Sequence, residues 1–325
     1  MEKAFRKVCN HQSAGLLIYK MIMNTAVTVA MLVGAIGVIV DMLLGGEQDP
    51  DAFLNGMMQA ISDTSGAGWG YMLAIVIGIL GILLWKKPRF FRREILRRGR
   101  PMDMGSFAAI LGVFMSAQLF SLLGLMIMDF ILGFFGKSMT AFLESGGSVS
   151  TDSLSMWLYA GLGAPIFEEL LFRGIVMRSM EPYGKRISIL LSALLFGFYH
   201  GNPVQAPFAF LVGLVLGYVA MEYNIIWAMV LHMFNNLIFA DSIPRLLQDL
   251  PVAAQNWLMY GLIFLLALVA AVILIVKRRK VFAFFKKDPI QPWQYNAAFL
   301  SPLVLILIGS CVVDMVLFML MVLIV

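Results

Sequence analysis

Three short stretches of the sequence place charged or amide side chains inside otherwise apolar segments. They are "EELLFR" (168–173), "FGFYH" (196–200) and "HMFNN" (232–236). A charged side chain at the centre of a lipid bilayer costs about 2.5–3.5 kcal/mol on insertion scales. Such groups therefore pair with one another or take part in function, and these stretches are the first candidates for a functional site.

Helix geometry separates the two adjacent glutamates of the first stretch. Residues four apart share a helix face, so Glu169 should lie against Arg173, whereas Glu168 is turned away by about 100°. Arg173 can then neutralise Glu169 and leave Glu168 for a second role. Pro165, just before them, removes a helix hydrogen bond and favours a local kink.

The other two stretches repeat the four-residue spacing, which pairs Phe196 with His200 and His232 with Asn236 on shared faces. At 1.5 Å per residue, Glu168 lies roughly 15 Å, His200 about 20 Å, His232 about 10 Å and Asn236 about 16 Å from the cytoplasmic ends of their predicted helices. Groups from three helices thus reach similar depths, and we expect them to meet in one polar cavity.

These side chains are the parts of a water-activating acyl hydrolase. A carboxylate and a neutral imidazole can share a water molecule and remove its proton, which suits Glu168 and His200. His232 and Asn236 can donate hydrogen bonds to a developing oxyanion. The sequence has no Gly-x-Ser-x-Gly elbow, and no serine or cysteine stands out as a nucleophile.

Two alternatives remain open from the residues alone. Glu168, His200 and His232 could instead supply three zinc ligands and leave an open position, although no H-E-x-x-H motif is present. The charged groups could also bind a peptide or relay protons in a membrane protein that is not an enzyme. In that case Glu169 and Arg173 form an ordinary buried ion pair. Phe196 is expected to pack around the site as a supporting residue.

Composition indicates the kind of protein that must position these groups. The 325 residues are 61% hydrophobic and 13% charged, and the mean hydropathy is +0.87, whereas soluble domains are about 45–50% apolar and about 25% charged. We therefore expect an all-α, polytopic bundle of about eight or nine transmembrane helices. Cys9 and Cys311 suggest neither a disulfide framework nor a thiolate metal site.

Nine apolar runs are candidate spans: 14–44, 70–85, 105–135, 154–177, 187–200, 206–221, 225–240, 255–276 and 297–325. Loops 86–100 and 277–287 carry eight and six basic residues, whereas loop 45–69 has four acidic residues and no lysine or arginine. The positive-inside rule then places the N-terminus in the cytoplasm and the C-terminus outside. It also explains the net charge of +5 without nucleic-acid binding. We expect a multi-pass protein of a bacterial cytoplasmic membrane with a retained first helix.

Taken together, the three stretches resemble the motifs EExxxR, FxxxH and HxxxN of the CPBP (CAAX protease and bacteriocin-processing, Abi) intramembrane glutamic protease family, which is related to type II CAAX prenyl endopeptidases. The resemblance covers roughly residues 150–245. It implies a catalytic core over 151–245, between N-terminal helices with a basic cytoplasmic loop (1–150) and C-terminal helices (246–325).

The resemblance further implies a metal-independent glutamate endopeptidase that needs no cofactor. By motif position, Glu168 resembles the catalytic glutamate that activates water with His200. Glu169 and Arg173 resemble its supporting pair, and His232 and Asn236 resemble the oxyanion-stabilising pair. The implied substrate is a membrane-embedded or lipid-anchored protein or peptide. Some bacterial relatives are instead linked to bacteriocin self-immunity or scaffold roles.

Overall fold

Helices joined by turns form every element of this protein in the part of the chain that is described. The computed structural model describes residues 1–45, 49, 51, 54–57, 59, 67–86, 88–91, 95–144 and 151–324. Parts of the predicted loops 45–69 and 86–100, the predicted boundary at residue 150 and Val325 lie outside the described residues. No strand occurs within those ranges, which confirms the predicted all-α class.

The longer helices are α1 (Glu2–Gly45), α3 (Trp69–Trp85), α5 (Met104–Met115), α6 (Gln118–Gly133), α11 (Lys185–Tyr199), α12 (Gln205–Glu222), α13 (Ile225–Phe234), α15 (Val252–Val276), α16 (Arg278–Lys287), α17 (Pro292–Phe299) and α18 (Pro302–Ile324). The shorter elements are α4 (Pro88–Phe90), α7 (Met139–Phe142), α8 (Leu154–Leu158), η3 (Tyr159–Gly163), α9 (Ala164–Glu168), η4 (Glu169–Met177), α10 (Arg178–Met180), η5 (Glu181–Tyr183), η6 (Asn235–Ser242) and α14 (Ile243–Leu247).

Six helical segments among the described residues are long and apolar enough to cross a membrane. They are α1, the pair α5–α6, α12, the run Ile225–Leu247, α15 and α18. The predicted count of eight or nine spans is therefore not confirmed. Helix α11 is 15 residues long, roughly 22 Å against a hydrocarbon core of about 30 Å, and α3 has only 17 residues. The predicted span 154–177 is divided among short α-helical and π-helical elements.

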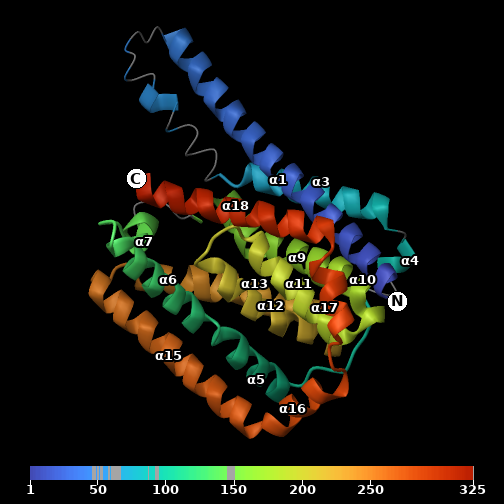
Figure 1. The fold of residues 1–325 in the computed structure, drawn as a ribbon. Helices are drawn as coiled ribbons and strands as arrows, with labels where there is room; N and C mark the ends of the chain where they lie inside the picture. The colour runs from blue at the N-terminus through green and yellow to red at the C-terminus, as the bar shows by residue number, and fades with distance from the viewer. Residues whose placement is uncertain are drawn as a thin grey trace.

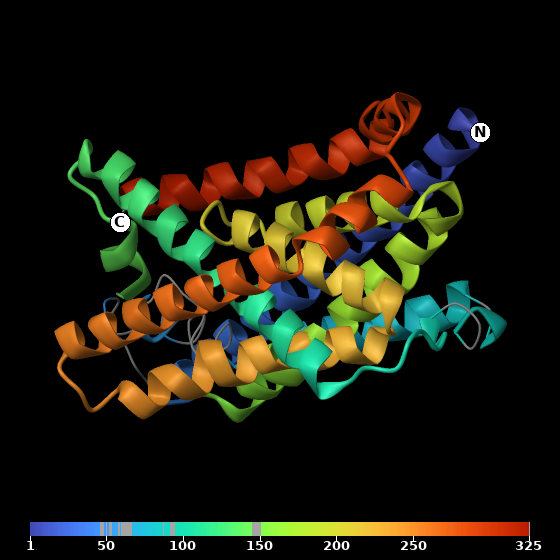
Figure 2. The same cartoon turned by 90° about the horizontal axis from the view of Figure 1, so that it is seen from below.

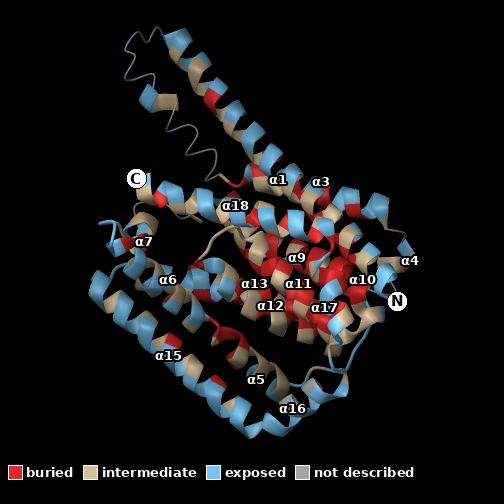
Figure 3. Cartoon of the chain, in the orientation of Figure 1, coloured by how far each residue is buried: buried red, intermediate tan, exposed pale blue. Residues whose placement is uncertain are grey.

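The elements that carry the three motifs lie at the centre of the bundle. In Figure 1, α1 and α18 lie on one side of α9, α11, α12 and α13, while α5, α6 and α15 lie on the other, and Figure 2 shows α15 and α18 as outer helices of the bundle. Buried residues concentrate in the central helices, whereas the outer faces of α1, α15 and α18 are exposed (Figure 3). Because those faces are apolar, they suit contact with lipid.

Helices α11 and α12 pack closely because two glycines of α12 face α11. A Cβ atom at Gly213 would lie 3.1 Å from the Cα atom of Ala193, and one at Gly217 would lie 3.0 Å from Cγ2 of Ile189. Small residues four apart permit such close helix approach. The Gly213–Gly217 pair thus allows α12 to lie close to α11.

The chain widens into π-helical turns on both sides of α9. Pro165 lacks an N–H, and in a regular α-helix its ring would collide with the carbonyl group of Gly161. In η3 the N–H of Ala164 instead bonds to the carbonyl oxygen of Tyr159, five residues earlier, so the turn makes room for the proline. The predicted distortion at Pro165 thus takes the form of wider turns, which frequently occur at functional sites.

Two acidic residues outside the three motifs have structural partners. Asp314 on α18 forms an ion pair with Lys20 on α1, with 2.5 Å between oxygen and nitrogen. Asp129 on α6 accepts hydrogen bonds from Ser138 and from the backbone N–H of Thr140, at 2.8 and 3.0 Å. These contacts tie α1 to α18 and fix the turn that leads into α7.

Candidate active site

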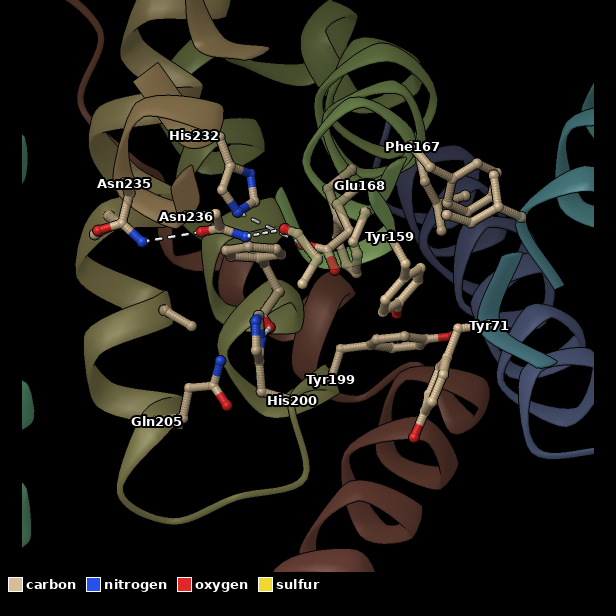
Figure 4. A pocket seen from close by; sticks show the side chains of 18 of the residues that line it. Tyr71, Tyr159, Phe167, Glu168, Tyr199, His200, Gln205, His232, Asn235 and Asn236 are labelled. Carbon is tan, nitrogen blue, oxygen red and sulfur yellow. Dashed lines mark hydrogen bonds and ion pairs between the residues drawn. The ribbon is translucent and has the colours of Figure 1, made fainter. Parts of the chain in front are cut away.

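A cavity of about 390 Å³ lies among the central helices, with its walls formed by residues from all three motifs. Glu168, His200, His232 and Asn236 line it together (Figure 4). They come from α9, the C-terminal end of α11, α13 and η6, respectively. The structure thus brings together the four residues that the sequence analysis selected.

The first contact in the site is a fully buried ion pair. The Nη1 atom of Arg173 lies 2.9 Å from Oε1 of Glu169, and both side chains are completely inaccessible to solvent. Arg173 also donates from Nη2 to the backbone oxygen of Gly213 at 3.3 Å, and its guanidinium group lies 4.2 Å from the ring centre of Phe196. The pair predicted from the four-residue spacing is therefore present and is held by α12 and α11 as well.

His232 also contacts Glu169, and the spacing of the motifs does not predict this contact. Its Nδ1 atom lies 2.9 Å from Oε1 of Glu169. Because an ionised carboxylate can only accept a hydrogen bond, Nδ1 carries the proton. The other ring nitrogen, Nε2, lies 3.8 Å from Oε2 of Glu168. His232 therefore stands between the two adjacent glutamates.

The two glutamates have different surroundings, as helix geometry predicts. The Glu169 side chain is 0% exposed, whereas that of Glu168 is 27% exposed and lines the cavity. Within the described part of the chain, the carboxylate of Glu168 has one ion-pair contact, the distant one with His232. Glu168 is therefore accessible to a molecule in the cavity, and Glu169 is not.

His200 is held in one orientation by its own helix. Its Nδ1 atom lies 2.8 Å from the backbone oxygen of Phe196, one turn earlier. A carbonyl oxygen accepts and does not donate, so Nδ1 carries the hydrogen and Nε2 of the neutral ring is left as an acceptor. The Phe196 ring is nearly perpendicular to both His200 and His232, with ring centres 4.7 and 5.8 Å apart. Phe196 thus spaces the two imidazoles and supports the arginine.

Asn236 belongs to a chain of amide hydrogen bonds. Its Nδ2 atom donates to the backbone oxygen of Ala160 at 2.8 Å, and its Oδ1 atom accepts from Asn235 at 3.0 Å. Asn235 in turn accepts from Gln118 of α6 at 2.8 Å. This chain fixes the Asn236 amide and leaves its second N–H able to donate elsewhere.

One known family matches the segment of the chain that carries the three motifs. Residues 150–238 match the family model described as type II CAAX prenyl endopeptidase Rce1-like. This segment is Rce1-like. It contains all three motifs, so the match confirms the family resemblance, and it supports a membrane endopeptidase of the CAAX-protease type in general. Searches of curated proteins and of solved structures found no match.

Several polar residues of the cavity were missed by the sequence analysis. Within the Rce1-like segment these include Tyr159 and Tyr199, and outside it Tyr71 of α3. Figure 4 shows these three tyrosines on the side of the cavity opposite Asn235. The rings of Tyr71 and Tyr159 stack with centres 4.8 Å apart. Tyr199 directly precedes a motif histidine, which was a usable signal, whereas nothing in the sequence links Tyr71 to the motifs.

The geometry gives no support to the zinc-dependent alternative. That alternative needs three ligands, predicted as Glu168, His200 and His232, to converge on one ion. No group of three histidine, cysteine, aspartate or glutamate side chains in the described ranges is arranged to hold a metal ion. These three residues instead line a cavity, and the Nδ1 atoms of the two histidines contact oxygen atoms of Phe196 and Glu169.

Proposed function

We propose that the protein is an intramembrane, metal-independent glutamate endopeptidase that hydrolyses a peptide bond of a membrane-embedded or lipid-anchored protein or peptide. The observation that carries this proposal is the difference in solvent exposure between the two adjacent glutamates, Glu168 and Glu169. Glu169 is sealed against Arg173 and His232, while Glu168 opens into the cavity that His200 also lines. Only one of the two carboxylates is therefore available to a water molecule and a substrate.

The first chemical step would be attack by water. Glu168 and Nε2 of His200 act as acceptors for a water proton, as general bases do. The water oxygen bonds to the carbonyl carbon of the peptide, and the carbonyl oxygen becomes an oxyanion. Collapse of this intermediate breaks the C–N bond, and the proton taken from water passes to the leaving nitrogen.

His232 and Asn236 would stabilise the oxyanion. Because Nδ1 of His232 already donates to Glu169, donation from Nε2 requires the doubly protonated ring. The charges of this imidazolium, the Arg173 guanidinium group and the carboxylates of Glu168 and Glu169 then sum to zero. No uncompensated ion is left in the bilayer. Asn236 adds the N–H that Ala160 does not occupy.

Arg173 would act as a positioning residue. It fixes the carboxylate of Glu169, which in turn orients the imidazole of His232. Orientation of a catalytic histidine through a carboxylate hydrogen bond is a general device in hydrolases. The fully buried pair can do this without touching the substrate.

The test is identification of cleaved peptides in cells that carry the wild type or Glu168→Gln. Mass spectrometry of membrane and secreted peptides should find products that depend on the wild-type protein and disappear in the variant, while its expression and thermal unfolding stay unchanged. A chelator should leave wild-type cleavage intact. Full cleavage of a verified substrate by Glu168→Gln would show that this catalytic assignment is wrong.

A further inference from the structure

A second cavity, of about 750 Å³, lies among α5, α11, α12, α15 and α16. We call it the basic cleft. It shares no lining residue with the candidate active site. Its lining in the described part of the chain includes no carboxylate but has four cationic side chains: Arg100, Arg186, Lys277 and Lys280.

The basic cleft is built from helix ends on one side of the bundle. The cleft lies on the side of the bundle where α5 and α11 begin and where α12 and α15 end. Alternation of chain direction places these four ends on the same side, and Arg100, Arg186 and Lys277 lie at or next to them. Charge is therefore concentrated at the mouth of the cleft.

Below this mouth the walls are apolar. They include Ile110 and Val113 of α5, Leu214 and Val215 of α12, and Ile273 of α15. From Ser106 to Val113 the α5 wall runs roughly 10 Å at 1.5 Å per residue, which is comparable with the roughly 15 Å of hydrocarbon in one leaflet. The cleft thus has a charged upper part and an apolar lower part on the scale of one lipid molecule.

The four cationic side chains differ in the hydrogen-bond and ion-pair partners that they have within the protein. Arg100 pairs with Glu222, and Nε of Arg186 donates to the backbone oxygen of Asp288. Lys277 and Lys280 are exposed and have no carboxylate partner among the described residues. These two lysines are therefore the positions that can accept an anionic group without breaking an existing ion pair.

Aromatic rings lie between the charged and apolar parts. The rings of Tyr218 and Phe284 meet edge to face with centres 5.4 Å apart, and the guanidinium group of Arg100 lies 5.6 Å from the ring centre of Tyr223. Tyrosine is enriched at the level of lipid headgroups, where its ring is apolar and its hydroxyl is polar. The rings therefore indicate where a headgroup meets its acyl chains.

We propose that the basic cleft binds an anionic phospholipid. The phosphate group of the lipid lies at Lys277 and Lys280, and its acyl chain lies against the walls formed by α5, α12 and α15. An acyl chain gains little by moving from the bilayer to an equally apolar wall. The headgroup must therefore decide binding, and a basic pocket between transmembrane helices favours a net negative lipid over a zwitterionic one.

The test compares two variants that remove the same charge from the same region. Lys277→Gln with Lys280→Gln alters the mouth of the cleft, whereas Lys286→Gln with Lys287→Gln alters α16 outside it. Each protein is placed in nanodiscs of equimolar phosphatidylglycerol and phosphatidylcholine, and retained lipids are counted by native mass spectrometry. The wild type should prefer phosphatidylglycerol by roughly tenfold or more, given the usual contribution of two basic residues. The first variant should lose this preference and the second should keep it.

A second pair of variants tests the apolar wall without changing charge. Ala109 lines the cleft, whereas the next residue, Ala108, is exposed and does not. Ala109→Phe should reduce lipid retention, and Ala108→Phe should leave it unchanged. Both proteins are checked for the same thermal unfolding, so a folding defect is recognised separately.

Four results would overturn the proposal. These are no lipid preference in the wild type, an equal loss in both lysine variants, displacement of the lipid by soluble glycerol phosphate, and displacement by a prenylated peptide. The second would indicate general surface charge, the third a site for free phosphate and the fourth a substrate pocket. Because Glu168→Gln should bind lipid like the wild type, the result is independent of the proposed protease activity.

Discussion

His232 contacts both members of the adjacent glutamate pair, through a different ring nitrogen for each. Its Nδ1 atom lies 2.9 Å from Glu169, and its Nε2 atom lies 3.8 Å from Glu168. One imidazole thus connects the sealed carboxylate to the carboxylate that lines the cavity. This arrangement makes His232 the residue whose loss should affect the proposed chemistry without removing the water-activating groups.

Replacement of His232 by Gln should lower the turnover number by roughly 10²–10³, the usual cost of losing one oxyanion donor. The Michaelis constant should change little, because the lost interaction is made in the transition state. Steady-state kinetics on an identified substrate measures both quantities. His11→Gln is the matched control, since His11 packs against Trp85 and does not line the cavity. Equal turnover in the two variants would contradict the role of His232.

Arg173 is expected to matter for stability because its removal leaves a buried carboxylate uncompensated. Arg173→Met should cost about 3–5 kcal/mol of unfolding free energy, the range found when one partner of a buried ion pair is lost. The double variant Glu169→Gln with Arg173→Met should recover most of this stability, since neither charge remains. Denaturant unfolding in detergent micelles measures the difference.

The same pair of variants separates structure from catalysis. The double variant should remain poorly active even when stable, because His232 has lost the carboxylate that orients it. If it were as active as the wild type, the positioning role of Arg173 and Glu169 would be refuted. If the single variant unfolded like the wild type, the buried pair would have no role in stability.

Gly213 allows α12 to approach both α11 and Arg173. A Cβ atom there would lie 3.1 Å from the Cα atom of Ala193 and 3.2 Å from Nη2 of Arg173. Gly213→Ala should therefore destabilise the fold by about 1–3 kcal/mol, as overpacking of a close contact does. Gly261→Ala is the control, because no heavy atom lies within 4 Å of its added Cβ atom. Equal unfolding midpoints for the two variants would show that the contact relaxes freely.

Local spacing was sufficient to predict part of the candidate site. The four-residue interval between Glu169 and Arg173 predicts their contact, because both residues lie on one face of the same helix. The same geometry predicts that Glu168 has other surroundings. The estimated depths also placed Glu168, His200 and Asn236 near one another, since helices of a bundle run side by side.

Contacts between distant segments could not be predicted in this way. The bond from His232 to Glu169 depends on how α13 turns relative to η4, and the bond from Gln118 to Asn235 depends on how α6 packs. The count of eight or nine spans is not confirmed, and for the span 154–177 one reason is that hydropathy does not reveal the π-helical turns around Pro165. Helix rotation is set by tertiary packing, which a single sequence pattern does not report.

The stability of the protein at acidic pH should depend on Glu181, which lies outside the predicted spans and forms an ion pair with Arg97 of the basic loop 86–100. Burial disfavours the charged form of its carboxyl, but hydrogen bonds from Arg97 and Arg178 outweigh this effect and lower its pKa below the ordinary value of 4.5. A carboxyl with a lowered folded-state pKa stabilises the fold above its unfolded-state pKa. This stabilisation is lost as the pH falls through the lower folded-state value.

Thermal unfolding should therefore show a pH-dependent difference between the wild type and Glu181→Gln. At neutral pH the wild type should have the higher midpoint, because its ionised carboxylate contacts Arg97 and Arg178 at 2.8 and 3.0 Å. Below the folded-state pKa the difference should shrink, since the protonated carboxyl resembles the amide. Glu2→Gln serves as the control, because Glu2 forms an exposed ion pair with Arg6 on a single helix. A difference that stays constant from neutral to acidic pH would contradict a role for the ionised Glu181 carboxylate.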